Sequence, residues 1–196
     1  SHIAESRNGA GILKLVQKGM RRTVLFVIAV VFLSSLASVK AVAETMSEEQ
    51  VKAAFLFNFA KFVEWPAEAF TGPEASIIFG VLGDDDVGTA ITKLAGKTVY
   101  GRTVAVRRYQ DVRDVKGCHV LYIGASYMGS VEIVIASLRG KPVLLVSNEE
   151  GFAERGGMIN FVLERSKVGF EINADAAKRS KLGVSAQLIK LARTVY

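Results

Sequence analysis

Three short apolar runs set the strongest limit on the fold of this chain. They are SIIFGVLG at 76–83, CHVLYIG at 118–124 and PVLLVSN at 142–148. Each run is too short for a buried helix and rich in strand-forming residues, so each predicts a strand that is covered on both faces. Helix-like segments, 84–96 and 129–138, separate them. This alternation predicts an α/β fold with a mostly parallel sheet flanked by helices.

The pattern changes in the last quarter of the chain. The segment GGMINFVLERSKVGFEIN, 156–173, predicts a β-hairpin whose turn lies near 165–167. Two closing helices are expected at 174–181 and 185–193. The second helix is expected to dock on the sheet through Leu188, Leu191 and Ala192.

The N-terminal region has the parts of a secretory signal peptide. Residues 20–43 contain a short basic start, an apolar run and the small-residue motif Ala41-Val42-Ala43. We expect cleavage after Ala43, export to the periplasm, and a single α/β domain at 44–196. Residues 1–19 show no such pattern and are expected to be an extension outside the mature protein. An uncleaved anchor is the alternative, but the apolar run is short for a membrane span.

The basic charge of the chain lies largely in this leader. Of the 25 Lys and Arg and 19 Asp and Glu residues, six basic residues and one acidic residue fall within residues 1–43, which leaves 19 basic and 18 acidic side chains. A net charge of +1 removes the main argument for a nucleic-acid partner.

An aromatic stretch, FLFNFAKFVEWP at 55–66, predicts most of a helix at 47–63. Ser47 is a suitable N-cap with Gln50 as its capping-box partner, and Pro66 is expected to end the helix. At 100° per residue, one apolar stripe contains Val51, Phe55, Phe59 and Phe62.

Phe57 falls off this stripe, on the polar side of the predicted helix. An aromatic side chain there has to be covered by another part of the chain or by a partner. Phe57 is therefore a candidate partner-binding residue.

Few motifs indicate catalysis. There is no nucleophile elbow, P-loop, dinucleotide fingerprint or zinc spacing, so the sequence predicts no cofactor and gives an enzyme hypothesis little support, although carboxylate chemistry needs no fixed spacing. Asp84, Asp85 and Asp86 follow a predicted strand at the sheet edge where open α/β sheets bind ligands, and Ser126 follows another. These four residues are a candidate ligand pocket. The competing interpretation is that Asp85 or Asp86 only caps the next helix.

One cysteine, Cys118, excludes an internal disulfide. It begins an apolar run, which favours burial. His119 is its neighbour in a predicted strand, so the two side chains should point to opposite faces.

The order and spacing of three segments carry a resemblance to a known family. VKAAFLFNFAKFVEWP, then GGMINFVLERSKVGFEIN about 90 residues later, then LIKLAR, resemble the YfiR-like family over nearly all of 48–193. The resemblance implies an exported, non-catalytic α/β domain that forms a homodimer. It implies repression of an inner-membrane diguanylate cyclase of the YfiN type, or binding to a sensor kinase. An outer-membrane lipoprotein that sequesters the repressor is also implied.

The chain departs from the best-known repressors, which carry several cysteines. Redox control through an internal bridge cannot apply with Cys118 alone. In the predicted hairpin, Phe161, Phe170 and Ile172 are expected to face the core. Asn160, Glu164 and Glu171 lie on the other face and are candidate partner contacts, or merely solvated residues.

Three hypotheses follow from the sequence. The first is a periplasmic regulator that binds a membrane signalling protein. The second is a periplasmic small-ligand sensor with its pocket near Asp84–Asp86 and Ser126. The third and weakest is a metal-assisted hydrolase built on the three aspartates.

Overall fold

A seven-stranded sheet runs through the part of the chain that the computed structural model describes, residues 46–196. The expected extension, the signal peptide and the cleavage site after Ala43 lie outside these residues. Within 46–196, no helix combines the length and the apolar character that a membrane span needs.

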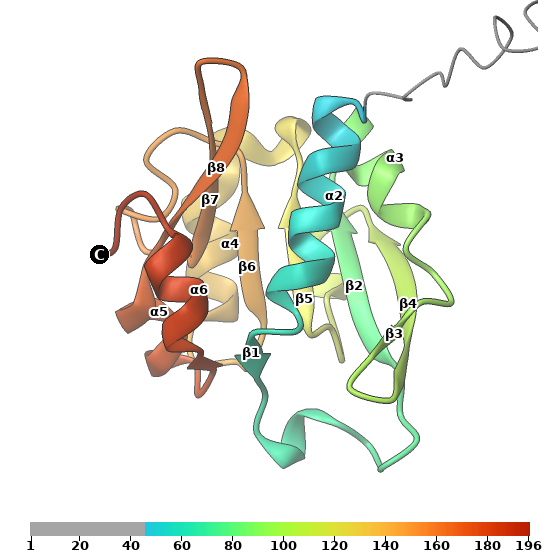
Figure 1. Cartoon of the computed structure of the whole chain (residues 1–196). Helices are drawn as coiled ribbons and strands as arrows, with labels where there is room; N and C mark the ends of the chain where they lie inside the picture. Colours follow the sequence, from blue (N-terminus) through green and yellow to red (C-terminus); the bar gives the residue numbers. More distant parts are fainter. Residues whose placement is uncertain (1–45) are drawn as a thin grey trace, which may run out of the picture. The chain divides into compact units, whose positions relative to one another are not determined.

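The sheet has the order β3-β4-β2-β5-β6-β7-β8 (Figure 1). Its five inner strands are parallel to their neighbours, and only the edge strands β3 and β8 are antiparallel. The predicted mostly parallel sheet is therefore confirmed. The strands are β2 (Ile77–Leu82), β3 (Thr98–Val99), β4 (Arg102–Tyr109), β5 (Val120–Ile123), β6 (Leu144–Ser147), β7 (Ile159–Glu164) and β8 (Lys167–Ile172).

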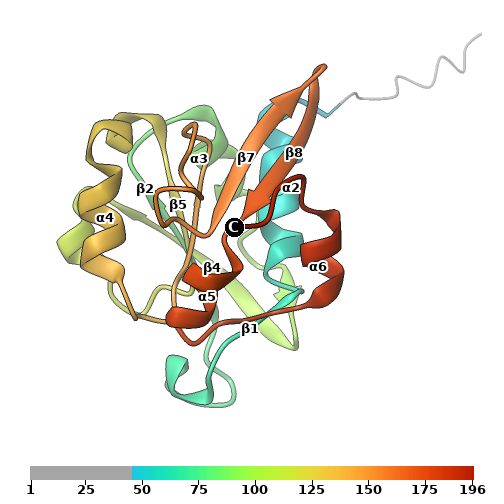
Figure 2. The same cartoon turned by 90° about the vertical axis from the view of Figure 1, so that its left-hand side faces the viewer.

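Helices cover both faces of this sheet, as predicted. Figure 2 shows α2 and α6 on one side of the strands and α4 on the other. Every residue of β2, β5 and β6 is buried, which explains why these strands are continuous apolar runs. The helices are α2 (Glu48–Phe59), α3 (Asp86–Thr92), α4 (Val131–Leu138), α5 (Ala174–Arg179) and α6 (Ala186–Leu191), with 3₁₀ turns η1 (Ala67–Ala69), η2 (Val112–Asp114) and η3 (Ala125–Ser130).

Helix α2 begins as predicted and ends earlier than predicted. Ser47 caps it, and both hydrogen bonds of the capping box with Gln50 are present. The helix stops at Phe59 rather than at residue 63. The chain then forms the two-residue strand β1 (Val63–Glu64), which pairs with β9 (Gly183–Val184). This long-range pairing ends the helix before Pro66 can do so.

The C-terminal hairpin has the predicted turn. Arg165 and Ser166 have φ angles of 48° and 63°, the left-handed conformation of a two-residue hairpin turn. Phe161 and Phe170 face each other across the two strands and pack on Phe59 of α2, with ring centroids 5.7 and 4.9 Å from it. These two residues and Ile172 are buried, which confirms that this face belongs to the core.

The closing helices are present but shorter than predicted. Leu188 of α6 is buried, whereas Leu191 is 63% exposed, so the prediction that Leu191 docks on the sheet is wrong. The helix ends at Leu191, and the chain after it turns back along β8. There Val195 forms a parallel bridge with Ile172. The last turn therefore presents Leu191 to solvent.

Strand order reverses at β2, which lies between β4 and β5. In open α/β sheets, the carboxyl edge at such a reversal is the usual ligand site. The predicted Asp84–Asp86 and Ser126 pocket belongs to this edge. A second polar region lies farther along the same edge, after β6 and on the hairpin.

Candidate functional site

The fold brings Asp84, Asp85 and Ser126 together after β2 and β5. The Asp84 backbone N–H donates to Ser126 Oγ at 2.9 Å. Asp84 itself is exposed, and its carboxylate accepts from the guanidinium of Arg108 at 3.0 Å. Asp86 lies in the first turn of α3 and is exposed. The sequence therefore identified residues that meet in space.

Asp85 is the centre of this cluster, and both of its carboxylate oxygens accept hydrogen bonds from the chain. Its carboxylate accepts from the backbone N–H of Gly88 at 2.7 Å and of Ala125 at 3.1 Å. It also accepts from the hydroxyl of Tyr122 at 2.9 Å. Burial, and then the charge of Asp85, raise the pKa of Tyr122, so this hydroxyl remains a donor. Asp85 is a helix cap that also joins β5 to β2.

Among the described residues, the three aspartates do not meet in one cluster of metal-ligating side chains. Within residues 46–196, no three His, Cys, Asp or Glu side chains are arranged to hold a metal ion. Asp85 already accepts three hydrogen bonds from the chain through its two carboxylate oxygens. These hydrogen bonds join the ends of β2 and β5 at the strand-order reversal.

Phe57 is half-buried and packs against the core. The ammonium groups of Lys61 and Lys97 lie 4.4 and 5.8 Å from the centre of its ring. This geometry is that of a cation–π interaction. The chain itself therefore supplies cover for this off-stripe aromatic ring.

The hairpin residues predicted to contact a partner have different surroundings. Glu164 is exposed and forms an ion pair with Arg193. Asn160 and Glu171 face each other across β7 and β8, and Asn160 Nδ2 donates to Glu171 at 3.3 Å. Asn160 is only 1% exposed, so it is not a solvated surface residue.

A polar groove of about 490 Å³ brings Asn160 and Glu171 together with residues that the sequence did not indicate. Its other wall is the loop after β6. We call it the acidic groove, because three of its lining residues are glutamates. Its polar lining residues are Asn148, Glu150, Glu154, Asn160, Glu171 and Tyr196.

The electrostatics of this groove are negative. Partial burial raises the pKa of the Tyr196 phenol, and the charges of Glu171 and Glu154 raise it further. No ion pair within residues 46–196 joins a cation to Glu150, Glu154 or Glu171. The groove therefore carries uncompensated negative charge.

An acceptor in the wall of this groove lacks a partner. The Oδ1 atom of Asn160 is buried and has no hydrogen-bond partner among the described residues. An unpaired buried acceptor costs about 1–3 kcal/mol. The chain covers this atom, so the groove is suited to a cationic group through its glutamates rather than through Asn160.

Cys118 and His119 are buried structural residues. Burial raises the pKa of the Cys118 thiol to about 12, which keeps it protonated and unreactive. His119 Nδ1 accepts from the Ile78 N–H at 2.9 Å, and Nε2 lies 3.0 Å from the Ala69 carbonyl oxygen. This pattern requires the neutral ring protonated on Nε2. Burial lowers the pKa of His119, which favours that neutral form.

The acidic groove could not be found from sequence spacing. Glu150 and Glu154 lie in a loop without a motif, and Tyr196 is 25 positions from Glu171. One signal was available, since Asn160 lies within a strand between the apolar residues Ile159 and Phe161. A buried polar residue in such a strand indicates either a hydrogen-bond network or a site.

Comparisons with known proteins give one family match. The model of the family described as DUF4154, YfiR/HmsC-like, matches residues 49–193. This match contains α2 except its first residue, the whole sheet, the acidic groove except Tyr196, and both closing helices.

Two solved structures resemble the chain at 11% identity and a TM-score of 0.48 each. One is the ABC domain in complex with L-Trp from Streptococcus pneumonia, with 76% of this chain and 60% of that chain covered. The other is a conserved domain protein from Vibrio cholerae O1 biovar El Tor, with 77% and 61% covered. The chain thus spans about three fifths of the length of these proteins.

Proposed function

The chain belongs to the YfiR/HmsC-like family, and from this premise we propose that it is a non-enzymatic periplasmic regulator of a membrane signalling protein. The partner proposed is the periplasmic part of an inner-membrane diguanylate cyclase, with a sensor kinase as the alternative. The family match over 49–193 is the observation that carries this proposal. Export through the N-terminal leader and assembly as a homodimer are parts of the same proposal.

The acidic groove is the proposed contact surface. Its three glutamates have no cation partner within residues 46–196, and the buried Oδ1 of Asn160 accepts no hydrogen bond there. A lysine or arginine side chain from the partner would supply positive charge and hydrogen-bond donors to these glutamates. The hairpin beside the groove adds Leu163, which is 56% exposed and offers apolar contact area.

The proposed mechanism is a shift of population. A signalling protein that exchanges between inactive and active states is held inactive by a protein that binds only the inactive state. The extent of repression is set by the difference between the two affinities. Release by a sequestering outer-membrane lipoprotein requires only that it compete for the same surface.

Cross-linking in living cells tests this proposal. A tag placed directly before Met46 leaves Tyr196 of the groove unaltered, and mass spectrometry identifies the membrane proteins that are recovered. We expect a diguanylate cyclase or a sensor kinase. Glu150→Lys should lower its recovery about tenfold, because a like charge then faces the basic group of the partner.

Glu74→Lys is the matched control, since Glu74 is also exposed and lies outside the groove. It changes the net charge equally and should leave recovery unaltered. Recovery of no membrane signalling protein would overturn the regulatory proposal. Equal recovery with both variants would retain the partner and reject the groove.

The alternative function, a small-ligand sensor at Asp84–Asp86 and Ser126, has less support. Asp85 accepts three hydrogen bonds from its own chain, and Ser126 Oγ accepts from the Asp84 backbone. A ligand at that place would have to displace these internal bonds. We therefore propose no function for this cluster.

A further inference from the structure

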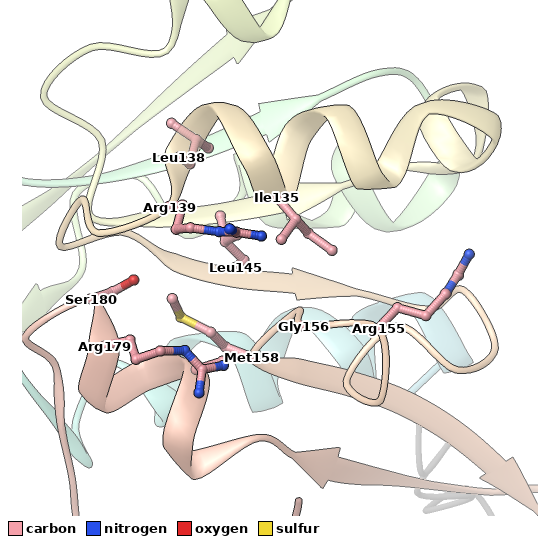
Figure 3. A pocket seen from close by; sticks show the side chains of 10 residues that line it. Ile135, Leu138, Arg139, Leu145, Arg155, Gly156, Met158, Arg179 and Ser180 are labelled. Carbon is pink, nitrogen blue, oxygen red and sulfur yellow. The ribbon is translucent and has the colours of Figure 1, made fainter.

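A second groove, of about 320 Å³, lies between α4 and α5 over strand β6 (Figure 3). Its floor is formed by aliphatic and thioether side chains from α4, β6 and the start of the hairpin. These are Ile135, Leu138, Leu145 and Met158, all of them buried in the core. The lining contains no aromatic ring on which a planar ligand could stack.

Two arginines stand at the rim of this groove. Arg139 follows α4 and Arg179 ends α5. In Figure 3 their side chains lie on opposite sides of Leu145 and Met158. We call this feature the arginine groove. Its position places two guanidinium groups beside an apolar floor.

The charges of these two arginines are not neutralised by the chain. Neither one has an acidic partner within 4.0 Å among residues 46–196. Arg155, which also lines the groove, differs from them because it pairs with Glu132 and Glu149 at 2.7 Å each. The groove therefore has a net positive rim.

Helix geometry accounts for part of this arrangement. A cation near the C-terminus of a helix is favourable, and both Arg139 and Arg179 are at such ends. The helix dipole would favour these two cations even if their side chains pointed away from the groove. It does not require both arginines to line a single apolar cavity.

We propose that the arginine groove binds a free acyl carboxylate, a ligand with a short aliphatic chain and an anionic head. The chain would lie on Leu138, Leu145 and Met158. The carboxylate would be held by Arg139 and Arg179, since a guanidinium matches a carboxylate with two parallel hydrogen bonds. A volume of about 320 Å³ suits one short chain and is at the small end for ligand pockets.

This inference is independent of the proposed regulatory function. The arginine groove and the acidic groove share no lining residue. Small-molecule binding and partner binding can therefore be tested separately.

Titration calorimetry of the purified protein with octanoate tests the proposal. We expect binding at or below millimolar concentration, no binding of acetate, and weaker binding of 1-octanol, because acetate lacks the chain and 1-octanol lacks the charge. Arg139→Gln and Arg179→Gln should each weaken octanoate binding about tenfold, as expected for the loss of a charged hydrogen-bond partner.

Lys178→Ala is the matched control, because Lys178 adjoins Arg179 in α5 and does not line the groove. It should leave octanoate affinity unchanged. Vesicles of phosphatidylglycerol distinguish the source of the anion, and binding to them without binding of free octanoate would reject the acyl carboxylate. Absence of octanoate binding, or equal affinity in the Arg139→Gln/Arg179→Gln double variant, would also overturn the proposal.

Discussion

The carboxyl edge of the sheet contains two polar regions that differ in how completely their hydrogen bonds are made. After β2 and β5, Asp85 accepts from Gly88, Tyr122 and Ala125. After β6 and on the hairpin, Asn160 Oδ1 accepts from nothing within the described residues. The first region is at the strand-order reversal, where the fold favours a ligand, yet it holds the edge together.

This difference shows that position in the topology and availability for binding are separate properties. A carboxylate that accepts several hydrogen bonds, as Asp85 does, contributes to stability, and its substitution lowers the free energy of unfolding. A buried acceptor without a hydrogen bond lowers stability, and the glutamates beside it have no cation partner in the described part of the chain and are free to bind one. Substitutions in the two regions should therefore have opposite consequences for folding and for partner recovery.

The largest effect is expected for Asp85→Ala. It removes a helix cap and leaves the Tyr122 hydroxyl and two backbone N–H groups with one partner fewer. We expect a loss of about 3 kcal/mol in the free energy of unfolding, measured by urea denaturation. Asp84→Ala is the control and should cost less than about 1 kcal/mol, since its ion pair with Arg108 is exposed. Equal losses in the two variants would remove the proposed contrast.

A pH effect of intermediate size is expected from His119, which lies at the opposite edge of the sheet and has both ring nitrogens hydrogen-bonded. Its folded pKa is lowered by burial, so the unfolded chain binds the proton first as pH falls below about 6.5. The stabilisation that neutral His119 gives to the folded state is thus fully present above about pH 6.5 and is lost as the pH falls below it. Between pH 7.5 and pH 5.5 we expect His119→Gln to reduce the acid sensitivity of unfolding by about 1 kcal/mol.

The folded protein resists protonation of His119 for a structural reason. A proton on Nδ1 would convert the acceptor of the Ile78 N–H into a donor, and that bond would be lost. The measurement is urea denaturation at both pH values for wild type and variant. An unchanged pH dependence in His119→Gln would show that other groups cause it.

A smaller effect on stability is expected for Asn160→Leu. The substitution removes the unpaired acceptor together with its one weak bond to Glu171, so the two effects oppose each other. The free energy of unfolding should change by less than about 1 kcal/mol, and recovery of the membrane partner should fall. A loss as large as that of Asp85→Ala would place Asn160 among the structural residues.

The smallest effect is expected from reducing agents. Cys118 is buried, its pKa is about 12, and no second cysteine exists in the chain. Treatment with dithiothreitol should leave the melting temperature and partner recovery unchanged. A thiol reagent should label Cys118 only after unfolding. Rapid labelling of the folded protein would contradict the burial of this side chain.

The sequence predicted most of the fold because the responsible signals are local. The apolar runs at 76–83, 118–124 and 142–148 each became a fully buried strand. The capping box at Ser47 and the hairpin turn near Arg165 also formed as expected. Errors occurred where a distant segment intervened, as at the end of α2, where β9 pairs with Val63 and Glu64.

The candidate sites were predicted less completely. Asp84 to Asp86 and Ser126 were expected to meet, and Asp84 and Asp85 do lie beside Ser126 and its neighbour Ala125, because the carboxyl ends of adjacent parallel strands are neighbours. Whether Asp85 was free depended on Tyr122 and Ala125, which lie 37 and 40 positions away. No spacing rule contains that information.

The sequence by itself determined the α/β class, the buried strands, the hairpin and the family. Periodicity, caps and turn residues act within a few positions, so they can be recognised along a single chain. Only the tertiary structure decided which polar atoms are paired. It also brought Glu150, Glu171 and Tyr196 into one groove, and Arg139 and Arg179 into another. Pairing and charge compensation depend on distances between segments that are far apart along the chain, and folding alone sets those distances.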